Sequence, residues 1–282
     1  MRIVAITNQK GGCGKTTTAV NLAAALAMQG HRTLLVDLDP QAHATIGLGL
    51  TPERLQQTIY DALINPCITI GQIAQPTMIP NLSLASSNVL LCGAESQLSQ
   101  MPRREYILRQ RLCMVQDAFD WCLLDCSPSL SVLTLNAVTA ATDILIPVQT
   151  HYYAIEGLRQ MLETVDIVRD RFNPQLHPAR ILLTMSEKRT LLCRDVQQQL
   201  REYFRDAVFS TVIHRNIRLA EAPSAGQSIL TYDRHSTGAL EYTALAREIS
   251  TGSTAEQKPS IETVTESASV ECHADLALTN RV

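Results

Sequence analysis

The chain has 282 residues, of which 45% are hydrophobic and 18% are charged, and its net charge at pH 7 is −3. These proportions are ordinary for a globular protein with a substantial buried core, and so small a net charge argues neither for nor against a nucleic-acid partner. The longest weakly charged run, residues 130–149, contains Asp143, Pro147 and several hydroxyl residues, so it is better divided into a helix and a strand than taken as a membrane span.

The eight cysteines form no CxxC pair and have no zinc-type spacing with histidine. We therefore expect reduced thiols of a cytosolic protein rather than a metal site. The N-terminus runs directly into a predicted strand and shows no signal-peptide pattern.

In chain order, apolar runs alternate with helical patterns. The apolar runs predict strands at residues 2–7, 33–37, 82–86, 121–125, 143–148, 180–184 and 208–213. The patterns between them predict helices at residues 15–29, 103–118, 130–141, 154–172, 191–204 and 238–249. Several strands are apolar throughout, as parallel strands covered on both faces should be. The order predicts one α/β domain over residues 1–249, with a mostly parallel, twisted sheet of seven or eight strands and helices on both faces.

The charges are unevenly distributed along the chain. Residues 250–282 hold five acids and two bases in a composition rich in Ser, Thr, Glu and Ala, which predicts a disordered acidic tail. Residues 169–218 hold ten bases and five acids. Such an excess is either a solvated helix surface or the electrostatic footprint of an anionic polymer.

The stretch NQKGGCGKTTT, residues 8–18, lies between the first predicted strand and the first predicted helix. This is the context of a phosphate-binding loop in a P-loop NTPase, since glycines let backbone N–H groups surround an anion at a helix N-terminus. The pattern G-x-x-x-x-G-K-[ST] is not met, because Gln9 replaces its first glycine. Half of the four lysines of the chain lie in this loop, at Lys10 and Lys15.

The loop predicts a role for each of its polar side chains. Lys15 should reach the β- and γ-phosphates of a bound nucleotide, the Thr16 hydroxyl should coordinate Mg²⁺, and Thr17 should contact the α-phosphate. The residues expected to surround the nucleotide are Lys10, Gly11, Gly12, Cys13, Gly14, Lys15, Thr16 and Thr17. A thiol in the position of Cys13 should have a lowered pKa, although a small side chain that fills the loop is the simpler interpretation.

Two further strands end in aspartate at the same predicted edge of the sheet. Asp125 ends the strand at 121–125, and we expect it to contact Mg²⁺ through water. Asp37 ends the strand at 33–37 and Asp39 follows it, and a carboxylate there can orient the water that attacks the γ-phosphate. Asp39 is the first candidate for this role and Asp37 the second.

Five stretches together resemble the ParA/Soj family of chromosome and plasmid partition ATPases: KGGCGKTTTAVNLA, LLVDLDPQAHAT, LLDCSPSLS, IPVQTHYYAIEGL and IHRNIRLAEAPSAGQSI. The resemblance covers residues 2–249. This family has a deviant Walker A loop, which the cell-division regulator MinD and the nitrogenase iron protein share.

The resemblance implies a mechanism. Lys10 matches the signature lysine of the deviant loop, which crosses a dimer interface to the phosphates of the other subunit, so that ATP is held between two monomers. Asp39 matches the aspartate needed for hydrolysis, and Lys10, Lys15 and Asp39 are the catalytic residues expected.

Further positions follow from the same resemblance. Met185 and Asn216 match the surroundings of the adenine, and Arg189 and Arg218 match arginines implicated in sequence-independent DNA binding by the ATP-bound dimer. A centromere-binding protein of the ParB type would stimulate slow hydrolysis. The protein would be cytoplasmic and associated with the nucleoid when ATP is bound, and no membrane partner is expected.

The sequence departs from the family at four positions. Ser127 stands where the family has proline, Ala42 and His43 stand in place of Gly-Asn, and His214 replaces a proline. Ala42 removes a glycine just after the catalytic loop, so hydrolysis is expected to be altered.

Two alternative functions remain to be compared with the sequence. A membrane-associated positioning ATPase like MinD needs a basic amphipathic C-terminal helix, whereas the tail here is acidic. An iron–sulfur reductase needs cluster ligands, and Cys92 is the one candidate for such a ligand.

Overall fold

The computed structural model describes residues 1–151, 154–187 and 190–251. In these residues the chain forms eight strands: β1 (Arg2–Ile6), β2 (Thr33–Leu38), β3 (Ala74–Pro76), β4 (Leu82–Ala85), β5 (Trp121–Cys126), β6 (Asp143–Gln149), β7 (Arg180–Ser186) and β8 (Val208–His214).

The same residues form twelve α-helices and four 3₁₀ turns. The helices are α1 (Lys15–Met28), α2 (His43–Gly47), α3 (Ile59–Ile64), α4 (Ile70–Ile73), α5 (Leu91–Ser99), α6 (Ile107–Cys113), α7 (Val132–Ala140), α8 (Ala154–Arg171), α9 (Leu191–Phe204), α10 (Ile217–Glu221), α11 (Ile229–Tyr232) and α12 (Thr237–Thr251). The 3₁₀ turns are Pro52–Arg54, Arg104–Tyr106, Arg205–Ala207 and Ala222–Ala225.

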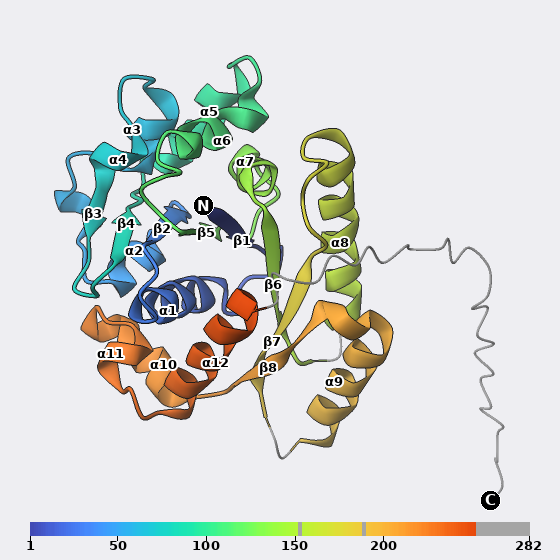
Figure 1. The fold of residues 1–282 in the computed structure, drawn as a ribbon. Coiled ribbons are helices and arrows are strands. Elements are labelled where there is room, and N and C mark those ends of the chain that lie inside the picture. The colour runs from blue at the N-terminus through green and yellow to red at the C-terminus, as the bar shows by residue number, and fades with distance from the viewer. Residues whose placement is uncertain (152–153, 188–189, 252–282) are drawn as a thin grey trace, which may run out of the picture.

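The strands form one sheet in the order β3-β4-β2-β5-β1-β6-β7-β8. Every neighbouring pair is parallel except β3 and β4. Helices cover both faces of this twisted sheet, with α1, α10, α11 and α12 on one face and α3 to α8 on the other (Figure 1). Because β1 lies in the middle of the sheet, the loop that follows it is flanked by the carboxyl ends of β5 and β6.

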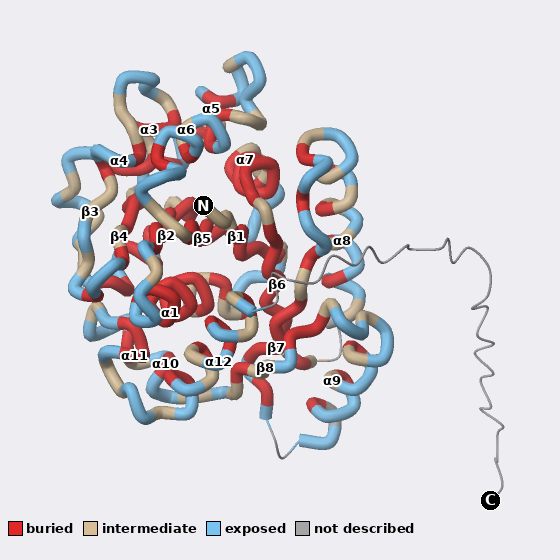
Figure 2. Tube along the Cα trace, viewed as in Figure 1, coloured by how far each residue is buried: buried red, intermediate tan, exposed pale blue. Residues whose placement is uncertain are grey.

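Each face of the sheet has its own apolar core. One core packs α1, α2, α11 and α12 against the sheet, and the other packs α3 to α9 against the opposite face. The central strands β2 and β5 are buried along their whole length, and buried residues follow the sheet and α1 through the middle of the molecule (Figure 2). Burial on both faces explains why these strands read as continuous apolar runs.

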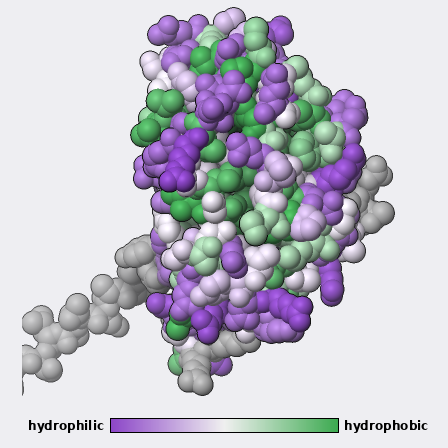
Figure 3. All heavy atoms as spheres, turned by 90° about the vertical axis from the view of Figure 1, so that its left-hand side faces the viewer, coloured by the Kyte–Doolittle hydropathy of each residue, from purple (hydrophilic) through white to green (hydrophobic). Residues whose placement is uncertain are grey.

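The sequence of β3 protects this edge of the sheet from pairing with a further strand. This strand has three residues and ends at Pro76, which has no backbone N–H to offer to a further strand. Hydrophobic and hydrophilic side chains are interspersed over the face of the molecule on this side (Figure 3).

The predicted fold is confirmed, and the differences lie in short elements. The helix predicted at 103–118 is a 3₁₀ turn followed by the shorter α6, and Arg103 itself lies outside the helix because it adopts φ 53°. The antiparallel β3 and the helices α2, α3 and α4 were not predicted, because they have too few residues to show a period. The nine-residue α5 was not predicted either. Residues 250 and 251 belong to α12, and the rest of the predicted acidic tail lies outside the described residues.

A close backbone contact fixes the segment that follows α2. Gly226 adopts φ 65°, and a Cβ added to it would lie 2.8 Å from Cα of Gly49, which itself has φ 83°. Glycine is required at Gly226 for both reasons, since a side chain would be strained by the left-handed backbone and would displace the segment it touches.

Gly226→Ala should therefore lower the free energy of unfolding by about 2 kcal/mol or more. Urea unfolding of the purified variant measures this change. Gly93→Ala is the matched control, because Gly93 lies inside α5 with nothing within 4 Å of an added Cβ. The control should be neutral or stabilising by up to about 1 kcal/mol. Equal losses in the two variants would show that the contact between residues 49 and 226 carries no special constraint.

Candidate functional site

The loop between β1 and α1 has the backbone of an anion-binding loop. Gly12 and Gly14 adopt φ values of 72° and 89°, which side chains disfavour and which turn the N–H groups of the loop inward. Strand β7 supports the loop, because the Thr184 hydroxyl donates a hydrogen bond of 2.9 Å to the carbonyl of Cys13. A Cβ at Gly14 would lie 3.9 Å from Cε of Met185, so the Met185 side chain lies against the loop.

The two lysines of the loop have different environments. Lys15 is buried, and its Nζ donates a hydrogen bond of 2.9 Å to the carbonyl of Lys10, within the loop. Lys10 is exposed, and its ammonium contacts Nε2 of His151, which follows β6. Lys15 is therefore held inside the loop of its own chain, whereas Lys10 stands on the surface beside it.

The prediction of a lowered pKa for Cys13 is wrong. Its thiol is buried and lies 3.2 Å from the carbonyl of Lys10. Burial raises the pKa of Cys13 more than the nearby Lys15 charge lowers it. Cys13 is therefore a small filler of the loop.

Asp125 is the second-last residue of β5, and its carboxylate is fully buried. Neither of its oxygens has a hydrogen-bond partner among the described residues. Burial raises the pKa of Asp125 well above its ordinary value, with the negative charge of Asp37 as the next cause, while the nearby Thr16 hydroxyl lowers this pKa. An unpartnered carboxylate beside the Thr16 hydroxyl is a donor set that fits Mg²⁺, which prefers such oxygens and keeps several of its waters.

Asp37 is the neighbour of Asp125 in the register of β2 and β5. Its carboxylate accepts hydrogen bonds from Asp39 N (3.1 Å), Thr45 N (2.9 Å) and Thr45 Oγ1 (2.7 Å). Burial nevertheless raises the pKa of Asp37 to about 6. A carboxylate with these bonds and no exposed surface is a structural anchor of α2, so the geometry favours Asp39 over Asp37 as the residue that orients water.

Asp39 is held at the edge of the site by its own loop. Its Oδ1 accepts a hydrogen bond from Gln41 N (2.9 Å), and its carbonyl accepts one from the Ser87 hydroxyl (2.8 Å). Its carboxylate is near enough to Asp125 to contribute to the raised pKa of that group. Ala42 follows in the left-handed conformation, at φ 54°, where a glycine would be unstrained.

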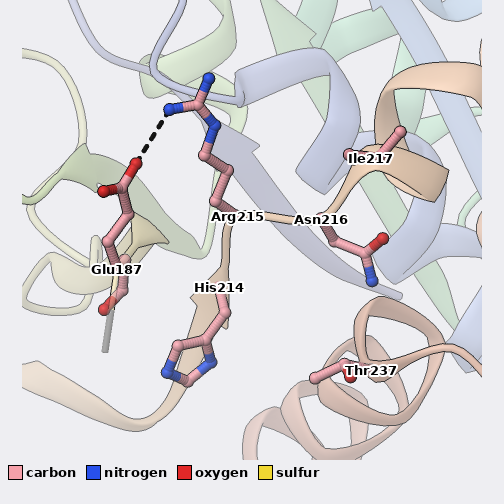
Figure 4. A pocket seen from close by; sticks show the side chains of 7 residues that line it. Glu187, His214, Arg215, Asn216, Ile217 and Thr237 are labelled. Atoms are coloured by element: carbon pink, nitrogen blue, oxygen red, sulfur yellow. Dashed lines mark hydrogen bonds and ion pairs between the residues drawn. The ribbon is translucent and has the colours of Figure 1, made fainter. Parts of the chain in front are cut away.

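A pocket of about 750 Å³ lies between the ends of β7 and β8 and the start of α12. Asn216 lines it, and its Oδ1 accepts a hydrogen bond from Arg218 N (2.8 Å), which turns the Nδ2 donor towards Thr237 (Figure 4). Glu187 and Arg215 form an ion pair of 2.8 Å at one side of the same pocket (Figure 4).

The structure shows the contacts of two residues that depart from the family pattern, His214 and Ser127. His214 lines the pocket, and Glu241 of α12 binds both its backbone N (2.9 Å) and its Nδ1 (2.6 Å). Ser127 follows β5 and its hydroxyl lies 3.0 Å from that of Ser129. Asp125 lies near the end of β5, two residues before Ser127.

Of the two arginines that the resemblance connects with DNA, the structure describes one. Arg218 lies on α10 with its side chain half exposed, and it pairs with Glu221 (2.8 Å) and Asp233 (3.7 Å). Arg189 lies outside the described residues.

Sequence reasoning missed the polar residues that hold the site together. Thr45 and Ser87 connect the ends of β2 and β4, since Thr45 Oγ1 also accepts a hydrogen bond from Ser87 N (2.9 Å). Asn8 connects β1 to β6 through a bond from its Nδ2 to the carbonyl of Pro147 (2.7 Å). The place of Asn8 directly after an apolar strand was an available signal, whereas nothing in the sequence distinguishes Thr45 or Ser87 from other hydroxyl residues.

Asp125→Asn should stabilise the protein in the absence of nucleotide and Mg²⁺, because it removes a buried charge without hydrogen bonds. The gain should be about 1–3 kcal/mol at pH 8. The raised pKa means that the folded protein retains a proton which the unfolded chain loses, so stability falls as the pH rises above about 4. The gain should therefore be smaller at pH 5 than at pH 8, as measured by urea unfolding.

Asp120→Asn is the matched control. Arg32 lowers the pKa of Asp120 to about 2, and the pair lies on the surface, so this substitution should give no gain and the same small effect at both pH values. A gain from Asp125→Asn that is equal at pH 5 and pH 8 would contradict the assignment of a raised pKa.

Relatives with named functions match 88% of the chain. A family model described as an AAA domain matches residues 1–178. The sporulation initiation inhibitor protein Soj of Bacillus subtilis is 47% identical over 248 residues, which are 88% of this chain and 98% of that protein. The chromosome partitioning protein ParA of Myxococcus xanthus is 46% identical over 248 residues, covering 88% of this chain and 87% of that protein.

A solved structure supports the same assignment of fold and cofactor. It is described as cobyrinic acid a,c-diamide synthase of Mycobacterium smegmatis with bound ADP and magnesium, and it is 33% identical, with a TM-score of 0.79 over 92% of this chain and 97% of that one. The chain therefore belongs to the ParA/Soj family of partition proteins, which are ATP hydrolases with ATP and Mg²⁺ as cofactors.

Proposed function

We propose that this protein is a partition ATPase that works as an ATP-dependent switch. ATP binding joins two copies of the chain, and the dimer binds DNA of any sequence. Slow hydrolysis, stimulated by a ParB-type centromere-binding protein, separates the copies and releases the DNA. Whatever favours the dimer then favours DNA binding, because nucleotide, dimer and DNA are linked by mass action.

The observation that carries this proposal is the difference between the two lysines of the loop. Lys15 is buried, with its ammonium inside its own loop, where it can hold the phosphates of its own nucleotide. Lys10 is exposed beside the same loop. An exposed ammonium next to bound phosphates can reach the nucleotide of a second copy, which is the role that the family resemblance gives to Lys10.

The other site residues fit the same reaction. Thr16 and Asp125 would hold Mg²⁺, directly and through water, and the Mg²⁺ ion would neutralise charge that develops on the phosphates. Asp39 would orient the attacking water. Met185 and Asn216 would contact the adenine, since Met185 lies against the loop and Asn216 lines the adjoining pocket.

DNA binding would use the basic excess of residues 169–218. Arg218 is its described member at a position matched to DNA binding, and its half-exposed guanidinium can exchange carboxylate partners for phosphate. Contacts of this kind go to phosphates, so the binding would not depend on the DNA sequence and would weaken strongly with salt.

The alternative of a MinD-like membrane ATPase has less support. No helix in residues 1–151, 154–187 and 190–251 has the length and apolar character of a membrane span. The tail in which a membrane-binding helix would lie is outside the described residues, and its sequence is acidic. Flotation with anionic liposomes and ATP is the direct test, and strong binding would favour this alternative.

A protein that binds ATP without hydrolysing it should remain a dimer. Asp39→Ala with ATP and Mg²⁺ should have twice the monomer mass by light scattering and should shift DNA of unrelated sequences at low salt. Without ATP it should be a monomer with weak DNA binding. A monomer that ignores DNA in the presence of ATP would refute the proposed function.

In the same background, Arg218→Ala should preserve the dimer and weaken DNA binding. The slope of log affinity against log salt should become shallower by about one if one phosphate contact is lost. An unchanged slope would remove Arg218 from the DNA interface without affecting the proposed dimer.

The two lysines should separate nucleotide binding from dimer formation. Lys10→Ala should retain ATP binding, measured with a fluorescent ATP analogue, and should lose the dimer and hydrolysis. Lys15→Ala should lose nucleotide binding as well. If the two variants behave alike in both measurements, the division of roles between Lys10 and Lys15 is wrong.

A further inference from the structure

The ammonium of Lys10 has an acceptor on its own subunit. Its Nζ contacts Nε2 of His151, 141 residues further along the chain. His151 is the second residue after β6, and β6 is the neighbour of β1 in the sheet. The fold thus brings the residue that follows one strand against the loop that follows the next.

Asn8 fixes this arrangement from the backbone side. Its Nδ2 donates to the carbonyl of Pro147 in β6 (2.7 Å), and its Oδ1 accepts from the backbone N of Lys10 (3.0 Å). One buried side chain therefore ties the Lys10 backbone to the strand that leads to His151. The approach of Lys10 to His151 follows from the bonded framework as well as from the flexible lysine side chain.

The chemistry of the contact requires a neutral imidazole. A lysine ammonium only donates hydrogen bonds, and Nε2 of a neutral histidine accepts one. Burial and the positive charge of Lys10 both lower the pKa of His151, which favours the neutral form at pH 7. The contact is therefore a hydrogen bond from Lys10 to His151 under ordinary conditions.

This inference rests on the proposed function, in which Lys10 binds the ATP of the other subunit. We propose that His151 is a positioning residue that holds the Lys10 ammonium on its own subunit and releases it when the ATP-bound dimer forms. The imidazole and the partner's phosphates compete for the same ammonium. His151 thus stabilises the monomer and opposes dimer formation.

The size of the effect follows from the number of contacts. Two such bonds break when one dimer forms, because each subunit contributes its own Lys10. An exposed hydrogen bond of this type contributes roughly a threefold factor, so the dimer constant should change about tenfold when both bonds are absent. This factor adjusts the ATP-dependent switch without changing the binding of nucleotide to Lys15.

The contact itself can be measured in the nucleotide-free protein. The imidazole proton resonance of His151 is identified by its loss in His151→Gln, and its titration gives the pKa. Lys10→Gln should raise this pKa, because a neighbouring positive charge is removed. The resonances of His43 and His235, on other parts of the surface, are the internal controls and should not move. An unchanged His151 pKa would show that the contact is absent and would overturn the proposal.

The consequence is measured on the dimer in the Asp39→Ala background, where ATP is not consumed. His151→Ala should lower the protein concentration at which half the chains are dimeric by about tenfold relative to Asp39→Ala alone. His151→Gln should stay close to the parent, because the Gln Oε1 can accept the same bond. This rescue distinguishes positioning of Lys10 from a purely structural role of residue 151.

The outcomes separate this inference from the proposed function. If Asp39→Ala dimerises and His151→Ala leaves the midpoint unchanged or raises it, His151 does not hold Lys10 back, and the proposed function stands. If His151→Gln shifts the midpoint as far as His151→Ala, the accepted hydrogen bond is not the cause. If Asp39→Ala fails to dimerise at all, the proposed function fails and this inference fails with it.

Discussion

Two buried carboxylates side by side at the ends of β2 and β5 are the constraint on which the site depends. Burial raises the pKa of both carboxyls because it removes the water that would stabilise their charged forms, and the negative charge of Asp37 raises the pKa of Asp125 further. Only Asp37 has hydrogen-bond donors for its carboxylate, which come from Thr45 and from the backbone N of Asp39. The carboxylate oxygens of Asp125 have no hydrogen-bond partner among the described residues. In the proposed function, a divalent cation bound near Asp125 would recover the stability that is lost there. Stability without the cofactor and binding of the cofactor would then be opposed at this one residue.

At the same edge of the sheet, the two lysines of the phosphate loop lie in different environments. Lys15 belongs to the loop interior because α1 begins with it and its ammonium turns back to the Lys10 carbonyl. Lys10 precedes the glycines and so stays outside, tied by Asn8 to β6. A difference of five positions in sequence thus becomes a difference between a buried and an exposed charge. In the proposed function, that difference separates binding ATP from dimerising on it.

The fold could be predicted from the sequence because parallel strands that are buried on both faces, such as β2 and β5, appear as continuous apolar runs. The sequence was also sufficient to locate the phosphate loop, because glycines, lysine and threonine there have few other uses. It could not show the bonding partners of Asp37 or the contact between Lys10 and His151. Thr45 lies 8 residues from Asp37 and His151 lies 141 residues from Lys10, so only the folded topology reveals either pairing. The pKa of Cys13 was mispredicted because sequence shows the neighbouring charges but not the burial that outweighs them.

In the proposed function, the charges around Arg218 would connect dimer formation to DNA binding. Arg218 and Arg215 each have a carboxylate within 2.8 Å, so neither acts as an isolated cation at short range. Residues 169–218 nevertheless hold ten bases and five acids. The net positive charge attracts anions within about one Debye length, which is about 10 Å at 0.1 M salt. A dimer would carry this excess of bases twice, and the binding free energies of its two copies to one DNA would add. DNA affinity would then rise much more steeply than the charge, so in the proposed function a switch that controls dimer formation would also control attachment to DNA.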